Sequence, residues 1–273
     1  MWKRIRRILI IVFAAVFLFC GGTVAVVQHQ YNVSRRLYRA ASSQYTSAAP
    51  AIVQENAEKP VWVDDGIERL PETAPIQVDF DALLEACPDV VGWIYCEDTV
   101  IDYPVVQGKD NDFYLHHSYN GEFNTSGTLF VDYRNFRDFQ DPSSIIYGHH
   151  MANGSMFAGL SMWQLRSYYE EHPVMWLLTP TQDYKVEIFS SYDISAYSNT
   201  YAFFHEYGEG FTQYLYDMAD RAAFRNDVEL DPNGRYVLLS TCAYRFADAR
   251  SVVHGRLRPV MSIAGQPIGP LAE

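Results

Sequence analysis

The chain has 273 residues, of which 48% are apolar, and its 33 acidic and 21 basic side chains give a net charge of −12. This length and apolar content are enough for a sizeable buried core, which excludes a disordered chain. Nucleic-acid binding needs clustered Lys and Arg, and the sequence has no such run beyond its N-terminus, so we expect no nucleic-acid partner.

The first predicted element is a membrane span over residues 8–27, an uncharged stretch long enough to cross the hydrocarbon core as a helix. A cleavable signal peptide is the alternative, but it should end at a small-residue cleavage site, whereas more apolar residues follow Gly21 and Gly22. Basic residues are concentrated in residues 1–7, and the next one is Arg35. This bias predicts a cytoplasmic tail over 1–7 and a single-pass protein of the cell membrane whose bulk is extracytoplasmic.

Residues 28–77 are predicted to form an extracytoplasmic stalk or linker. A short helix over 31–39 could continue the span, and 40–74 is rich in Ala, Ser, Pro and Glu without periodicity. The composition then changes to aromatic and β-branched runs. We therefore expect a folded catalytic domain over 78–262 and a C-terminal tail over 263–273.

The folded part begins with a predicted helix over 80–86, with Asp79 or Asp81 as its cap. Short β-strands separated by turn residues are predicted over 90–95, 101–106, 127–132, 144–147, 174–178, 185–189, 235–240 and 250–257. Helical stretches interrupt them at 157–166 and 209–224. Eight short strands at this spacing favour a closed or nearly closed barrel, with the second helix covering one side or gating the substrate.

Cys20 lies within the predicted span and three further cysteines lie beyond it. In an exported domain, an odd number indicates one disulfide and one free thiol. Cys87 and Cys96 are close enough in sequence to pair, although two ordinary buried thiols are an equal alternative. The cysteines have no metal-ligand spacing, and no acidic cluster compels a calcium site. We expect no metal site and no cofactor, and calcium dependence stays open.

Cys242 differs from the other cysteines because it ends an apolar strand and precedes a polar stretch. Its sulfur would emerge where a rigid sheet meets a loop, a common setting for catalytic groups. A thiol attacks only as the thiolate, which a nearby cation or imidazolium favours. Arg245, Arg250 and Arg256 are the cations nearby in sequence.

A nucleophilic cysteine needs a histidine from elsewhere in the chain as its partner. His149 and His150 are favoured because they follow a predicted strand and Gly148, which would let the backbone turn sharply. His254 is predicted to lie on the solvent face of a strand. The remaining histidines lie beside the membrane or in polar loops, where a solvated imidazole is the default: His29, His116, His117, His172 and His205.

These residues resemble the sortases. Residues 238–242 are similar to the sortase signature Thr-Leu-x-Thr-Cys, with Leu238 in place of its first threonine. Arg250 matches the active-site arginine of the family, and 147–149 resembles the segment that carries its histidine. His150 replaces an asparagine that is often found in class B sortases. Four further segments resemble that class: 89–94, 101–107, 110–115 and 127–132.

The resemblance implies a mainly β fold, an eight-stranded sortase barrel with an N-terminal helical segment and a helix inserted before the cysteine strand. It implies a catalytic site of Cys242, His149 and Arg250. This site would cleave a sorting motif near the C-terminus of a secreted protein through a thioacyl intermediate. An amine on a cell-wall peptide would then resolve the intermediate. The implied partners are therefore secreted proteins, a peptidoglycan amine and the membrane.

Three alternatives stay open. A pilus-type class C sortase would carry a lid with an Asp-Pro-Trp or similar motif before the barrel, and 61–67 shows none. A hydrolase could use the same site without an amine acceptor. A non-catalytic protein that binds the cell wall would account for the 20 tyrosines and five tryptophans, although aromatic residues also build cores.

Overall fold

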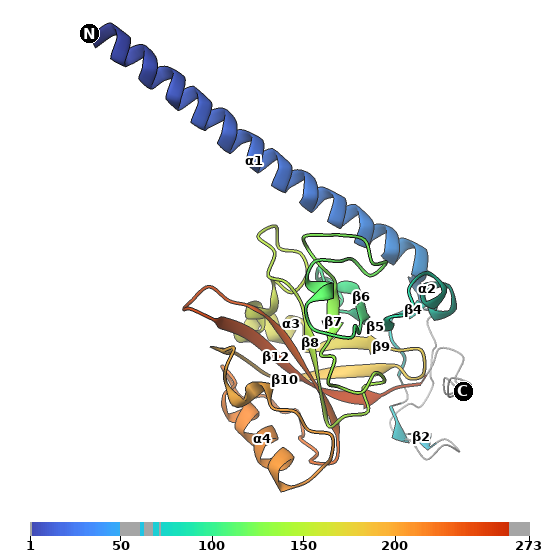
Figure 1. The fold of residues 1–273 in the computed structure, drawn as a ribbon. Helices are drawn as coiled ribbons and strands as arrows, with labels where there is room; N and C mark the ends of the chain where they lie inside the picture. Colours follow the sequence, from blue (N-terminus) through green and yellow to red (C-terminus); the bar gives the residue numbers. More distant parts are fainter. Residues whose placement is uncertain (1, 50–60, 63–67, 71, 262–273) are drawn as a thin grey trace.

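The computed structural model describes residues 2–49, 61–62, 68–70 and 72–261 as a long helix leading into a closed β-barrel (Figure 1). The barrel strands are β5 (Val90–Tyr95), β6 (Asp102–Val106), β7 (Leu129–Val131), β8 (Ser143–Tyr147), β9 (Val174–Leu178), β10 (Tyr184–Ser195), β11 (Arg235–Cys242) and β12 (Ala249–Pro259). Their order around the barrel is β10-β12-β11-β8-β7-β6-β5-β9. These are the eight strands predicted from the sequence, so the predicted barrel is confirmed.

The remaining elements lie outside the barrel wall. The helices are α1 (Trp2–Tyr45), α2 (Phe80–Ala86), α3 (Arg166–Glu171) and α4 (Glu209–Asp220), with 3-10 turns η1 (Phe113–Leu115), η2 (Leu160–Gln164) and η3 (Asn199–Tyr201). Two small sheets pair β1 (Thr46–Ala48) with β4 (Ile76–Val78), and β2 (Val61–Trp62) with β3 (Glu68–Arg69). The predicted helix over 157–166 is only a 3-10 turn, and α3 follows it.

Two strand pairings, β8 with β11 and β6 with β7, are parallel, and the other barrel pairings are antiparallel. The main core includes the fully buried Trp93 and extends to the buried residues of α1. A second apolar layer forms where α4 packs on the outside of the barrel. Its helical residues, such as Phe211 and Met218, share one face and cover Leu238 of β11. α4 therefore shields one side of the strand that ends at Cys242.

α1 is longer than the sequence predicts, because it continues to Tyr45 without a break. Its last part packs on the barrel through a stripe formed by the buried Tyr38, Ala41 and Tyr45. The Tyr38 hydroxyl donates to the Gly127 carbonyl and lies 2.8 Å from Thr128 Oγ1. Tertiary packing of tyrosine and alanine thus stabilises a helix whose composition resembles a linker. Part of the predicted stalk is helical, and the tail over 263–273 lies outside the described residues.

His254 contradicts the prediction that it lies on a solvent face, because its side chain is only 2% exposed. Its strand β12 is paired on both sides, and α4 covers this part of the barrel. The ring nitrogen Nε2 lies 2.9 Å from the Tyr192 hydroxyl. Burial, with a smaller contribution from the positive charge of Arg221, lowers the pKa of His254 to about 3.

We expect His254 to make folding sensitive to acid. Its folded-state pKa lies below the value of about 6.5 for an unfolded chain, so this contribution to stability is complete above about pH 6.5 and decreases as the pH falls. Between the unfolded pKa of about 6.5 and the folded pKa of about 3, the free energy of unfolding should fall with each pH unit by about 1.4 kcal/mol more than in His254→Phe. Phenylalanine cannot bind a proton, so this variant lacks the contribution. Urea unfolding at several pH values measures this difference, and parallel pH profiles would contradict it.

Candidate active site

Cys242 is the last residue of β11, at one end of the barrel. The strand before it is buried, whereas Cys242 itself is partly exposed and its thiol is free. Its directly paired residue on the antiparallel strand β12 is Arg250. Side chains of directly paired residues lie on the same face of a sheet, about 5 Å apart at Cβ. The pairing of β11 with β12 thus brings the Arg250 guanidinium and the Cys242 thiol to one edge of the site.

His149 reaches the same end of the barrel from the neighbouring strand β8. This strand runs parallel to β11, with Tyr147 paired with Ser240 and the Gly148 N–H donating to the Ser240 carbonyl at 3.0 Å. His149 lies two residues after Tyr147, and Cys242 lies two residues after Ser240, and the two strands run in the same direction. The parallel register therefore carries the imidazole and the thiol to neighbouring positions at the strand ends.

Gly148 is required for a different reason from the one that the sequence predicts. Its backbone does not adopt a positive φ, so no sharp glycine turn occurs there. A Cβ atom at this position would lie 2.4 Å from Leu129 Cδ2 and 2.7 Å from Phe157 Cδ2. The glycine lets these core side chains pack directly against the backbone that precedes His149.

A hydrogen bond determines the orientation of the His149 ring. Nε2 lies 2.8 Å from the Leu115 carbonyl oxygen, in the connection between β6 and β7. A carbonyl oxygen only accepts, so Nε2 carries a hydrogen. Nδ1 is therefore the nitrogen that remains to accept or release a proton. The ring of His116, which the sequence discounts, lies 6.4 Å from that of His149.

His150 contacts the chain just after Cys242, in surroundings that differ from those of His149. Its ring meets that of Tyr244 edge to face, with 5.1 Å between the ring centroids. Tyr244 belongs to the connection between β11 and β12. The Nδ1 atom of His150 is buried and has no hydrogen-bond partner among the described residues. Where the chain is extended, neighbouring side chains point to opposite sides, so we expect only one of the two histidines to face the thiol.

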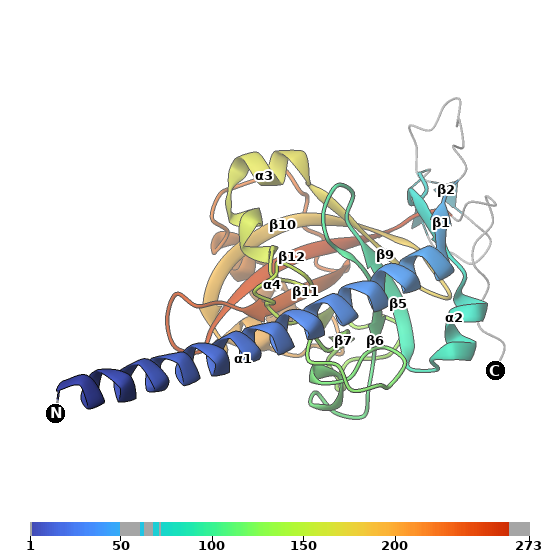
Figure 2. The same ribbon diagram turned by 90° about the horizontal axis from the view of Figure 1, so that it is seen from above.

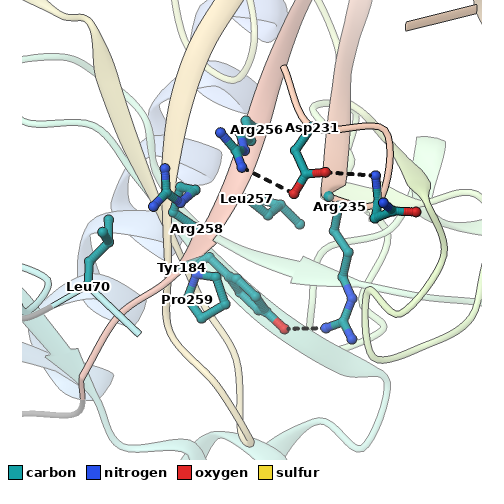
Figure 3. Close-up of a pocket in the computed structure, with 10 residues that line it drawn as sticks. Leu70, Tyr184, Asp231, Arg235, Arg256, Leu257, Arg258 and Pro259 are labelled. Atoms are coloured by element: carbon teal, nitrogen blue, oxygen red, sulfur yellow. Dashed lines mark hydrogen bonds and ion pairs between the residues drawn. The ribbon is translucent and has the colours of Figure 1, made fainter. Parts of the chain in front are cut away.

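The three arginines near Cys242 in sequence have different surroundings. Arg245 is paired with Asp193, with Nε 2.8 Å from Oδ2. Arg256 is paired with Asp231 in a pocket close to Arg235, the first residue of β11, at the barrel end opposite Cys242 (Figure 3). Among the described residues, Arg250 has no carboxylate partner, and its guanidinium donates to the Ala249 carbonyl at 3.0 Å. Of these three arginines, Arg250 is thus the one whose positive charge is not neutralised by an acidic side chain of the described residues.

The structure adds residues to the site that the sequence did not indicate. The Tyr201 hydroxyl lies 2.8 Å from Ser240 Oγ, two residues before the cysteine. Burial raises the pKa of Tyr201, and the charges of Arg250 and Cys242 act on it in opposite directions. Tyr147 stacks on Tyr201 and donates a hydrogen bond to Asp132. No local pattern marks Tyr201, because only the folded chain brings η3 to the end of β11.

The two cysteines that precede the barrel strands β5 and β6 are unsuited to nucleophilic chemistry. Cys87 and Cys96 are both buried and both free, so the structure has no disulfide between them. Burial raises the pKa of the Cys87 thiol and raises that of Cys96 to about 11. Among the described residues, no group of His, Cys, Asp and Glu has the arrangement of a metal site.

Known proteins with similar sequences and structures are sortases of class B. The chain is 32% identical to sortase B of Listeria monocytogenes over 253 residues, or 91% of this chain and 95% of that protein. It is 30% identical to sortase B of Staphylococcus aureus over 184 residues, or 67% and 75% of the two chains. Sortase B of Bacillus anthracis superposes with a TM-score of 0.66 at 29% identity, over 85% of this chain and 99% of that structure. No protein-family model matches the chain.

Proposed function

The chain belongs to the sortase B family of cysteine transpeptidases, and we propose that it is a membrane-anchored enzyme that attaches secreted proteins to the cell wall. The observation that carries this proposal is the partly exposed Cys242 at a strand end, paired in register with Arg250 and flanked by His149. A structure of S. aureus sortase B with a substrate superposes on this chain at a TM-score of 0.63 and 30% identity.

In the first half of the proposed reaction, the Cys242 thiolate attacks the carbonyl carbon of the threonine in the sorting motif. The carbonyl oxygen gains negative charge as the tetrahedral intermediate forms, and Arg250 stabilises it. Arginine suits this role because it stays protonated and offers several N–H donors. The carbon–nitrogen bond then breaks, and protonated His149 donates a proton to the leaving amine. A thioester on Cys242 remains.

In the second half, an amine of a cell-wall peptide attacks the thioester carbon. Nδ1 of His149 accepts the proton that the amine loses, and Arg250 again stabilises the oxyanion. The carbon–sulfur bond breaks, the thiolate leaves and a new amide bond joins the secreted protein to the wall. The hydrogen bond from His149 Nε2 to Leu115 supports this assignment, because it leaves the other ring nitrogen available for both proton transfers.

The localisation that we propose follows from α1, which is long and apolar enough to cross a membrane. The basic residues concentrated in 1–7 favour a cytoplasmic N-terminus, with residues 8–27 as the span and the barrel outside the cell. Sortase B relatives favour class B over a pilus-type class C enzyme. Because these relatives are enzymes, they also disfavour the alternative of a non-catalytic protein that binds the cell wall.

Product analysis distinguishes the proposed transpeptidase from a hydrolase that uses the same site. Peptides from a sorting-motif library are incubated with the enzyme, with and without a peptide amine as acceptor. We expect the acceptor to become joined to the threonine carboxyl group, at the expense of the free acid, because an amine competes with water for the thioester. Mass spectrometry identifies both products. Free acid as the sole product, formed at the same rate with and without the amine, would contradict transpeptidation.

A further inference from the structure

α1 allows the membrane-facing side of the barrel to be identified. The helix runs without a break from the proposed span into its packing contacts with the barrel. Tyr31 is packed against the main core, and one turn later Ser34 Oγ donates a hydrogen bond to Asn124 Oδ1 at 2.6 Å. At 1.5 Å per residue, Ser34 lies about 10 Å along the helix from residue 27. The headgroup region extends about 6 Å beyond the hydrocarbon core on each side, so the barrel begins close to this layer.

The connection between β6 and β7, residues 107–128, joins this contact to the active site. It binds α1 through Asn124 and binds His149 through the Leu115 carbonyl. Phe123, next to Asn124, is 72% exposed, and its ring lies perpendicular to that of His117, with 6.1 Å between the centroids. One loop therefore links the membrane-proximal part of α1 to the proposed catalytic histidine, and its exposed end carries an aromatic ring.

The connection between β11 and β12, residues 243–248, projects toward the same side. Figures 1 and 2 both show it extending from the barrel in the direction of the N-terminal half of α1. Tyr244 is 78% exposed and Phe246 is 50% exposed. The exposed Tyr197 lies beside this connection, because the Ala196 N–H donates to the Asp248 carbonyl at 2.9 Å. Cys242 directly precedes it, and Arg250 is the second residue after it.

These exposed side chains have the chemistry of a bilayer interface. Phenylalanine and tyrosine are costly to expose to water and favourable at the boundary between headgroups and acyl chains. The exposed Arg35 and Arg36 lie on α1 next to Ser34, where guanidinium groups can bind lipid phosphates. Aromatic rings on two connections and basic groups on the helix thus occur at the same end of the barrel.

We propose that the active-site end of the barrel rests on the outer headgroup layer, with Phe123 and the aromatic residues of the β11–β12 connection inserted into the interface. This contact rests on the membrane anchoring under the proposed function. It orients Cys242 toward the membrane surface, so the enzyme favours sorting motifs that lie close to the bilayer. A soluble protein partner on the same aromatic residues is the competing explanation, and the experiment below separates the two.

Photocrosslinking of the full chain tests the contact. p-Benzoylphenylalanine replaces Phe123 or Phe246, and in a matched control it replaces Tyr216, an aromatic residue of α4 that is 47% exposed. α4 lies on the side of the barrel away from α1 (Figure 1). Each protein is reconstituted into vesicles of phosphatidylglycerol and phosphatidylcholine and illuminated. We expect covalent lipid adducts, detected by mass spectrometry, at residues 123 and 246 in several-fold excess over residue 216.

Lipid adducts at 123 and 246 no more frequent than at 216 would overturn the proposal, as would crosslinks to protein alone. Hydroxyl-radical labelling of the unmodified chain gives a second test that needs no variant. Phe123 should be protected in vesicles relative to detergent, whereas Tyr216 should be labelled equally in both. Turnover of soluble sorting peptides is measured in parallel. If the protein turns over sorting peptides but makes no lipid contact, only the proposed membrane contact is refuted. If it contacts lipid but does not turn over sorting peptides, only the proposed function is refuted.

Discussion

Replacing Cys242 with alanine should reduce turnover of sorting-motif peptides by about a thousandfold or more, because loss of a covalent nucleophile removes the acyl-enzyme route. Cys242 is partly exposed at a strand end, beside an arginine that has no carboxylate partner in the described part of the chain. Alanine fits the same position at the end of β11 without disturbing the buried strand. Cleavage kinetics and the melting temperature of the variant measure the two effects separately.

The matched controls are Cys87→Ala and Cys96→Ala. Both thiols are buried and have raised pKa values, so these variants should lose some stability but keep turnover per folded molecule within a few-fold of the unmodified protein. Unchanged turnover in Cys242→Ala would remove Cys242 from the mechanism. Loss of turnover in a folded Cys87 or Cys96 variant would indicate a different nucleophile.

Replacing His149 with alanine should reduce turnover by about a hundredfold or more, the usual contribution of a general acid–base group. His149 follows β8 at the position that the parallel register brings beside Cys242, and its ring is oriented by the Leu115 carbonyl. His150→Ala should stay within about tenfold of the unmodified enzyme, because His150 packs against Tyr244 and performs no proton transfer in this mechanism.

The paired histidine variants form their own control, because both change the same segment by the same truncation. Turnover and melting temperature are compared for the two proteins under identical conditions. Loss of activity in His150→Ala alone would exchange the roles of the two residues. Equal losses in both, without loss of fold, would show that the imidazoles act together.

Much of the fold could be predicted because the barrel strands carry local signals. Short β-branched and aromatic runs between turn residues mark all eight strands, and the Asp79 cap of α2 is confirmed by a 3.0 Å hydrogen bond to the Ala82 N–H. The position of Cys242 at a strand end could be predicted in the same way. Arg250 is expected at the site from the family resemblance alone, and its direct pairing with Cys242 is a finding of the structure.

The remaining features depend on contacts between distant parts of the chain. α1 continues to Tyr45 because Tyr38, Ala41 and Tyr45 pack on the barrel. Their helical spacing is a local signal, but an Ala- and Ser-rich segment does not itself show which surface it packs on. His254 is buried because α4 covers its strand, and a strand sequence alone does not show which face another helix will cover. Tyr201 reaches Ser240 only through the long connection between β10 and β11. The positions of these residues are fixed by tertiary packing rather than by propensity.

Trapping the acyl-enzyme is the most direct test of the central claim that Cys242 is the nucleophile of a transpeptidase. The full chain is incubated with a cleavable sorting peptide without an amine acceptor, quenched in acid and analysed by intact-mass and peptide mass spectrometry. The mechanism predicts an adduct with the mass of the acyl fragment on the peptide that contains Cys242, which disappears when an amine is added. Cleavage without any such adduct, or an adduct that persists in Cys242→Ala, would contradict it.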